Sequence, residues 1–161
     1  MSNVLRVLLL LACIPVMSTS NNDHKKMPID QQQAIEKAIG DVHGKMKQAA
    51  EQRDTDALYE YILDMDKGVI IEDGRILRTR QEALSSTKQG MQGLKNLSYT
   101  YTQKYVTPIS ETAALWVGEG TTSATLEDGR QISAPFAETI VFVKKGGHWK
   151  VLHAHRSVPG R

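Results

Sequence analysis

The ten residues HWKVLHAHRS, at positions 148–157, place two histidines two positions apart near the end of the chain. Because alternate side chains of a β-strand share a face, His153 and His155 are expected to lie about 6 to 7 Å apart. The same alternation puts Trp149 on the side of the histidines and Arg156 on the other side. Imidazole changes charge near neutral pH, so the pair could exchange protons within one shared space.

Two other interpretations of the histidine pair stay open. A catalytic zinc site needs about three protein ligands and a structural one about four, but the spacing of His24, His43 and His148 brings none of them to this face. We therefore expect no metal and no organic cofactor. Alternatively, the two imidazoles simply pack and hydrogen-bond, either in a half-polar cavity or at a dimer contact on the outer face of a sheet.

One carboxylate lies in the predicted strand before the histidines. Glu138 belongs to the largely apolar run QISAPFAETIVFVKK, residues 131–145. Burying an unpaired charge is costly, so this carboxylate either has a partner or faces a polar cavity. The candidate partners are Arg156, His153 and His155. Glu138 and the two histidines are the candidate catalytic residues.

Aromatic residues of two further strands could line the same cavity. Trp116 lies in AALWVGEG, and Tyr99 and Tyr101 lie in LSYTYT. Core packing is the ordinary role of such side chains, and ligand contact is the alternative. Gly118 and Gly120 indicate a bend or bulge where the sheet curves.

The order of the predicted elements indicates how these side chains are held. A long amphipathic helix is expected from an N-cap at Asp30 to about Arg53, and a short helix after a cap at Asp54. The apolar arms of GVIIEDGRILRT, residues 68–79, predict a β-hairpin around Asp73-Gly74. The remaining predicted elements are a helix over about 80–95 and strands over 97–106, 112–126, 131–145 and 148–158. Helices followed by antiparallel strands indicate an α+β fold with helices on one face of a sheet.

The first twenty residues differ from the rest of the chain. Arg6 precedes the apolar run VLLLLACIPVM, and small residues follow, which is typical of a removable secretory signal. We expect a signal peptide over 1–20, a flexible leader over 21–29, and a periplasmic or secreted protein. Alternatively, Cys13 resembles a lipobox cysteine and would carry a lipid anchor. If the signal is removed, no cysteine remains for disulfides, thiolate catalysis or zinc.

Composition limits the partners. The 161 residues are 40% hydrophobic and 24% charged, which suits one globular domain. The 20 basic and 18 acidic residues are scattered along the chain, so no basic face is expected and nucleic acid is not an expected partner.

Several motifs together resemble the NTF2-like superfamily (nuclear transport factor 2 family), and within it the small SnoaL-like or DUF4440-type proteins. The resemblance covers residues 30–158 and rests on AEQRDTDALYEYI, GVIIEDGRIL, RQEAL and the terminal WKVLHAHRS. The last motif is also similar to the closing strand of the association domain of calcium/calmodulin-dependent kinases. The resemblance implies a strongly curved, mostly antiparallel sheet around a conical cavity, frequently with dimerisation through the outer sheet surface.

Ketosteroid isomerase, a member of this superfamily, uses an aspartate base and an oxyanion hole of a tyrosine and a protonated aspartate. On that pattern, Glu72-Asp73 falls at the place of the base and Glu138 near the protonated acid. The tyrosine position holds Met46, and loss of such a donor typically costs about two to three orders of magnitude in rate. Asp73 also has a simpler role, as a residue of an exposed hairpin turn.

We therefore expect an exported homodimer that binds a small, largely apolar molecule in its cone. The expected ligand-binding residues are Trp116, Tyr99, Tyr101 and Arg156. Two alternatives stay open: a cofactor-independent isomerase, cyclase or dehydratase-like lyase that transfers protons through histidine or Glu138, and an oligomeric assembly module.

Overall fold

The computed structural model describes residues 26–64, 70–72 and 74–158. The predicted signal segment with Cys13, the start of the predicted hairpin over 68–69, and Asp73 lie outside the described residues. Within the described part of the chain, no helix is long and apolar enough to cross a membrane. The predicted α+β architecture is confirmed: three helices accompany one mostly antiparallel sheet, and a short β-hairpin lies between the second and third helices.

Helix α1 (Ile29–Glu51) begins directly after Pro28. Proline has a fixed φ and no N–H, so it suits the start of a helix. Asp30 therefore lies in the first turn and makes no cap, which corrects the predicted N-cap. The buried positions Ile35, Ile39 and Met46 recur at helical spacing and direct one face of α1 to the sheet.

The two shorter helices both have a side-chain cap. Asp54 caps α2 (Thr55–Tyr59), as predicted, by accepting a hydrogen bond from the Ala57 N–H at 3.0 Å. Thr79 caps α3 (Arg80–Gly90) in the same way. Helix α3 ends before the predicted boundary near 95, because Gly93 adopts a φ of 73° and the next strand begins at once.

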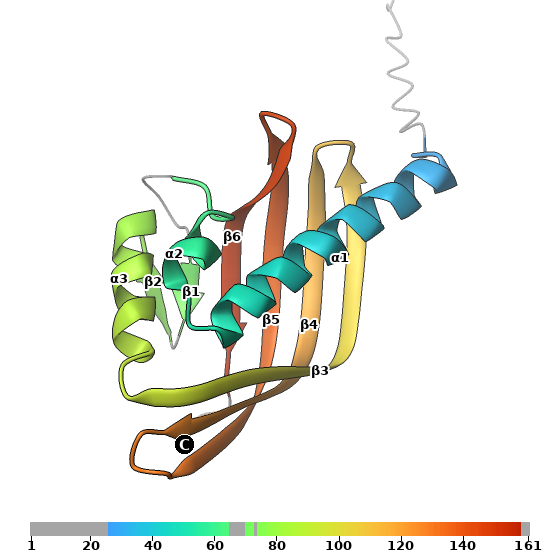
Figure 1. Ribbon diagram of the computed structural model, residues 1–161. Helices are drawn as coiled ribbons and strands as arrows, with labels where there is room; N and C mark the ends of the chain where they lie inside the picture. The colour runs from blue at the N-terminus through green and yellow to red at the C-terminus, as the bar shows by residue number, and fades with distance from the viewer. Residues whose placement is uncertain (1–25, 65–69, 73, 159–161) are drawn as a thin grey trace, which may run out of the picture.

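Six strands form one sheet in the order β2-β1-β6-β5-β4-β3. Their bounds are β1 Ile70–Glu72, β2 Arg75–Leu77, β3 Leu94–Ser110, β4 Ala113–Leu126, β5 Gln131–Lys145 and β6 His148–Ser157. Neighbouring strands are antiparallel except β1 and β6, which are parallel. Figure 1 shows α1 crossing the strongly bent strands β3 to β5, with α2 and α3 beside β1 and β2.

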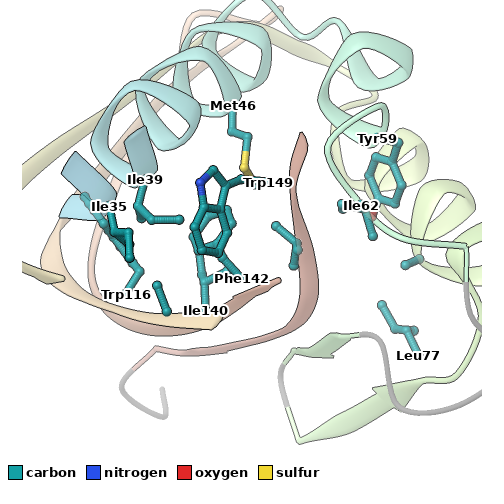
Figure 2. Close-up of a cluster of buried hydrophobic side chains, with 13 residues drawn as sticks. Ile35, Ile39, Met46, Tyr59, Ile62, Leu77, Trp116, Ile140, Phe142 and Trp149 are labelled. Carbon is teal, nitrogen blue, oxygen red and sulfur yellow. The ribbon is translucent and has the colours of Figure 1, made fainter. Parts of the chain in front are cut away.

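The hydrophobic core fills the space between α1 and the middle of the sheet. Figure 2 shows Ile39 and Met46 of α1 directed toward Ile140 and Phe142 of β5. Phe142 is completely buried, and Val151 of β6 is 1% exposed. This packing fixes α1 against the sheet and determines which α1 side chains face β5.

Two glycines allow the sheet to bend beside the core. A Cβ atom at Gly120 would lie 2.1 Å from the carbonyl oxygen of Thr100, and one at Gly118 would lie 3.0 Å from Cε1 of Tyr101. The pairing of β3 with β4 shifts register between Tyr101 and Gln103, opposite Gly120. The predicted irregularity is thus a bulge; Gly118 makes room for the Tyr101 ring, and Gly120 lets the β3 backbone approach closely.

Candidate functional site

A cavity of about 380 Å³ lies between the helices and the sheet. All three helices contribute to its wall, which is mostly apolar. The apolar part includes Met46, Leu58, Ile62, Leu97, Ile140 and Val151. A cavity of this size suits a small organic molecule.

Glu138 of β5 is the centre of a polar cluster in this wall. We call the five residues Glu138, His43, Tyr101, Arg156 and Tyr99 the Glu138 cluster; all five border the cavity. Oε1 of Glu138 accepts a hydrogen bond from the Tyr101 hydroxyl at 2.6 Å and lies 3.2 Å from Nε2 of His43. Oε2 accepts a hydrogen bond from Nη2 of Arg156 at 2.9 Å. Arg156 is one of the three partners that the sequence suggested for this carboxylate.

These contacts determine the charge of Glu138. Burial alone would raise the pKa of the carboxyl group, but three neighbours lower it to about 2: the hydrogen bond with His43, the charge of Arg156 and the hydrogen bond from Tyr101. Glu138 is therefore ionised near neutral pH. A carboxylate with so low a pKa is a weak base, so it serves better to orient its neighbours than to remove a proton itself.

His43 reaches this carboxylate from α1. Its ring stacks on Trp116, with centroids 3.7 Å apart and planes at 19°. Nε2 also lies 3.1 Å from the Tyr101 hydroxyl. An ionised Glu138 favours the tautomer with the proton on Nε2, which leaves the lone pair of a neutral imidazole on Nδ1. Among the described residues, Nδ1 has no hydrogen-bond partner.

Tyr101 is fixed as a hydrogen-bond donor. Burial, the charge of Glu138 and the hydrogen bond to it raise the pKa of the Tyr101 hydroxyl far above its usual range. The hydroxyl therefore keeps its proton across the physiological pH range and directs it at Oε1 of Glu138.

Arg156 of β6 is held by three groups besides Glu138. Nη1 donates a hydrogen bond to the Tyr99 hydroxyl at 3.3 Å. The guanidinium carbon lies 5.0 Å from the centre of the Tyr99 ring and 5.2 Å from that of the Phe136 ring, distances at which cation–π attraction is significant. The side chain is nevertheless 30% exposed, and it borders the cavity.

The predicted alternation along the last strand is wrong. Val151 pairs with Phe142 and His153 with Val141, so Leu152 is an extra residue in a β-bulge. The bulge shifts the alternation by one position. Trp149 and Val151 consequently share the helix-facing side with Ala154 and Arg156, not with the histidines.

The two histidines remain neighbours, but on the other side of β6. His153 is half-buried opposite Val141, and His155 is exposed opposite Thr139. His155 still borders the cavity, although its strand position is not the one opposite Glu138. The strand position opposite Glu138 is therefore occupied by Arg156, and the two histidines do not share a face with it as the catalytic interpretation required.

His43 is the residue of the Glu138 cluster for which no sequence pattern predicted a role. It lies four residues after Ile39 and three before Met46, both of which are buried, so the apolar stripe of α1 already contained it. A buried histidine in such a stripe needs a partner. Only the packing of α1 on β5 identifies that partner as Glu138.

The aromatic candidates have different positions. Tyr99 and Tyr101 border the cavity. Trp116 does not border this cavity. Its ring stacks on that of His43, and it borders a second hollow between α1 and β3. Within residues 26–64, 70–72 and 74–158, no three His, Cys, Asp or Glu side chains gather in a way that could hold a metal ion.

Comparison with protein families gives a match to the family described as the SnoaL-like domain, over residues 39–160. Comparison with curated proteins gives no match. Solved structures match over most of the chain at low sequence identity, so they support the fold alone.

Three of these structures illustrate the range of the fold. A proposed dehydratase of the NTF2-like family from Streptomyces avermitilis is 18% identical with a TM-score of 0.71, covering 80% of this chain and 99% of that one. A proposed scytalone dehydratase from Novosphingobium aromaticivorans is 14% identical with a TM-score of 0.73, covering 81% and 88%. A proposed calcium/calmodulin dependent protein kinase II association domain from Xanthomonas campestris is 14% identical with a TM-score of 0.67, covering 76% and 86%.

Proposed function

Since the chain belongs to the SnoaL-like domain family of the NTF2-like superfamily, whose fold leaves function open, we propose that it binds a small, largely apolar molecule in the cavity. The observation that carries this proposal is the mostly apolar wall of the 380 Å³ cavity, interrupted by the Glu138 cluster. Ligand sites in proteins typically combine an apolar wall with a few fixed polar groups.

Filling the cavity tests this proposal. Ala154 borders the cavity, whereas Ala137 is exposed on the neighbouring strand. The neutral fluorescent probe N-phenyl-1-naphthylamine should bind the wild type saturably, with one site per chain. Ala154→Phe should weaken binding about tenfold or more because it occupies the space, and the matched control Ala137→Phe should bind as the wild type does. Equal binding by all three proteins would place the probe outside the cavity.

A second candidate function is proton transfer by His43, and the contact of its Nε2 with Glu138 favours it. A carboxylate that holds one ring nitrogen orients the imidazole and stabilises its protonated form. His43 would remove a proton from carbon, and the electrons of that C–H bond would form a carbon–carbon double bond. The hydroxyl group on the adjacent carbon would leave as water with the proton that His43 took up, as in a dehydration. Two of the similar folds belong to proposed dehydratases. This role replaces the one that the sequence suggested for His153 and His155.

A substrate screen distinguishes this candidate from simple binding. Aromatic β-hydroxy ketones would be incubated with the protein, and the absorbance of the enone product would be followed. His43→Gln should reduce the rate about a hundredfold or more, since general base catalysis contributes about that much. His148→Gln, at an exposed position, is the matched control. A rate that His43→Gln leaves unchanged would remove His43 from the chemistry.

Export and homodimer formation are further proposals. Export rests on the signal-like segment over residues 1–20, and the homodimer rests on the family resemblance.

The alternative function, an assembly module, predicts larger, ring-shaped oligomers, which sedimentation velocity separates from dimers.

A further inference from the structure

The two charges of the buried ion pair are unequally exposed. The Glu138 side chain is 5% exposed, whereas the Arg156 side chain is 30% exposed. Both border the cavity. Arg156 therefore offers more accessible surface to a neighbouring molecule than Glu138 does.

The hydrogen-bonding groups that Arg156 and Tyr99 leave available at the cavity are donors. Glu138 already contacts three groups, His43, Tyr101 and Arg156. Arg156 uses one N–H of Nη2 for Glu138 and one of Nη1 for the Tyr99 hydroxyl, so three of its five N–H groups remain. The Tyr99 hydroxyl accepts from Arg156, and its own proton remains available.

The guanidinium is also fixed before any ligand arrives. Glu138 and the Tyr99 hydroxyl each hold one of its terminal nitrogens, and the rings of Tyr99 and Phe136 both lie within 5.2 Å of its central carbon. A guanidinium group that is already fixed loses little side-chain entropy when it binds a ligand. Its planar arrangement of N–H groups matches the two oxygen atoms of a carboxylate.

We infer that Arg156 and the Tyr99 hydroxyl form a receptor for an anionic oxygen group, so that the molecule bound in the cavity is an apolar body carrying one carboxylate. This inference rests on the proposed binding function and adds the chemical class of the ligand. A carboxylate would take up donors on Arg156 and Tyr99 while its apolar part contacts the wall. Glu72 also borders the cavity, opposite Arg156 in the pairing of β1 with β6, and its charge opposes such a ligand.

Three probes of equal size test the inference: 3-phenylpropionate, 3-phenylpropanol and 3-phenylpropylamine. Their dissociation constants would be measured by calorimetry with the whole mature chain at pH 7. The acid should bind about tenfold more tightly than the alcohol, because hydrogen bonds to charged groups are the stronger ones. The amine should bind most weakly, since it meets the arginine charge.

Two variants locate the effect without breaking the ion pair. Tyr99→Phe removes the hydroxyl and keeps the ring, so it should weaken acid binding about threefold to tenfold and leave alcohol binding unchanged. Glu72→Gln should strengthen acid binding a few-fold by removing a like charge. Tyr105→Phe is the matched control for the first variant, because Tyr105 lies on the same strand, is 61% exposed and donates its hydroxyl proton to Gln103.

The outcomes separate this inference from the proposed function. If the alcohol binds as tightly as the acid, or if Tyr99→Phe weakens both equally, the anion receptor is wrong and the binding cavity stands. If the amine binds best, the receptor is also wrong. If the acid, the alcohol, the amine and the neutral naphthylamine probe all fail to bind, the proposed function itself is wrong.

Discussion

At the scale of single residues, the site depends on a carboxylate that its neighbours keep ionised. Glu138 is 6% exposed, yet its pKa lies at about 2 because His43, Arg156 and Tyr101 all stabilise the charged form. The sequence identified Glu138 because a carboxylate is unusual in a largely apolar strand, and it gave Arg156 as one of three candidate partners. It assigned no role to His43, because a contact over 95 positions in sequence leaves no local pattern.

Glu138→Gln should therefore destabilise the fold strongly. The substitution removes the charge that pairs with Arg156 and weakens two further hydrogen bonds, so we expect a loss of about 3 kcal/mol in the free energy of unfolding. Urea denaturation at pH 7 measures it. Glu119→Gln, on the neighbouring strand and exposed, should change stability little. Equal stability of the two variants would contradict a buried, ionised Glu138.

The same carboxylate predicts a pH dependence. Its pKa is about 2 in the folded protein against the usual 4.5, so the stabilisation is fully present above about pH 4.5 and is lost as the pH falls toward 2. The stability difference between wild type and Glu138→Gln should narrow over this window. Urea curves at pH 7, 4.5 and 3 measure it, and a difference at pH 3 as wide as at pH 7 would refute the low pKa.

At the scale of the elements, sequence patterns predicted the helices and strands in the right order. They did not predict the bulge in β6, which changes which of its side chains share a face. Capping at Asp54 and helical spacing in α1 are local signals, and both appear in the structure. The bulge at Leu152 leaves no local sequence signal, because it arises from the pairing of β6 with β5. It places Arg156 on the same side of the strand as Trp149 and the two histidines on the other side, the reverse of the prediction.

Replacement of glycine by alanine should have opposite effects on stability at Gly120, where the sheet bends, and at Gly40 in α1. Gly120→Ala should destabilise by about 2 kcal/mol, because its Cβ would lie too close to the β3 backbone. Gly40→Ala should stabilise by about 0.5 to 1 kcal/mol, because Gly40 is exposed inside α1 and the added Cβ would meet no atom within 4 Å apart from the adjoining helix backbone and its two chain neighbours. Thermal unfolding measures both. A Gly120→Ala protein as stable as the wild type would show that the two strands do not approach so closely.

At the scale of the whole molecule, the helices cover one face of the sheet, and none of the described residues outside the sheet forms a helix on its other face, which we call the open face. On the open face, Tyr105 and Val117 lie opposite each other on β3 and β4 and are 61% and 37% exposed. If two copies pair through this face, as the family resemblance implies, Val117→Asp should shift the protein from dimer to monomer, because it buries a charge at the contact. Sedimentation equilibrium measures this. A dimer that survives the substitution would place the contact elsewhere.

The cavity is the feature of the whole molecule on which the proposed binding function rests, and locating a bound molecule tests that proposal most directly. Nuclear Overhauser effects would be recorded between 3-phenylpropanol and the methyl groups of the protein. We predict effects to Ile62, Ile140 and Val151, which border the cavity, and none to Val117 on the open face. Effects to Val117 without effects to the cavity residues would contradict a binding function for the cavity.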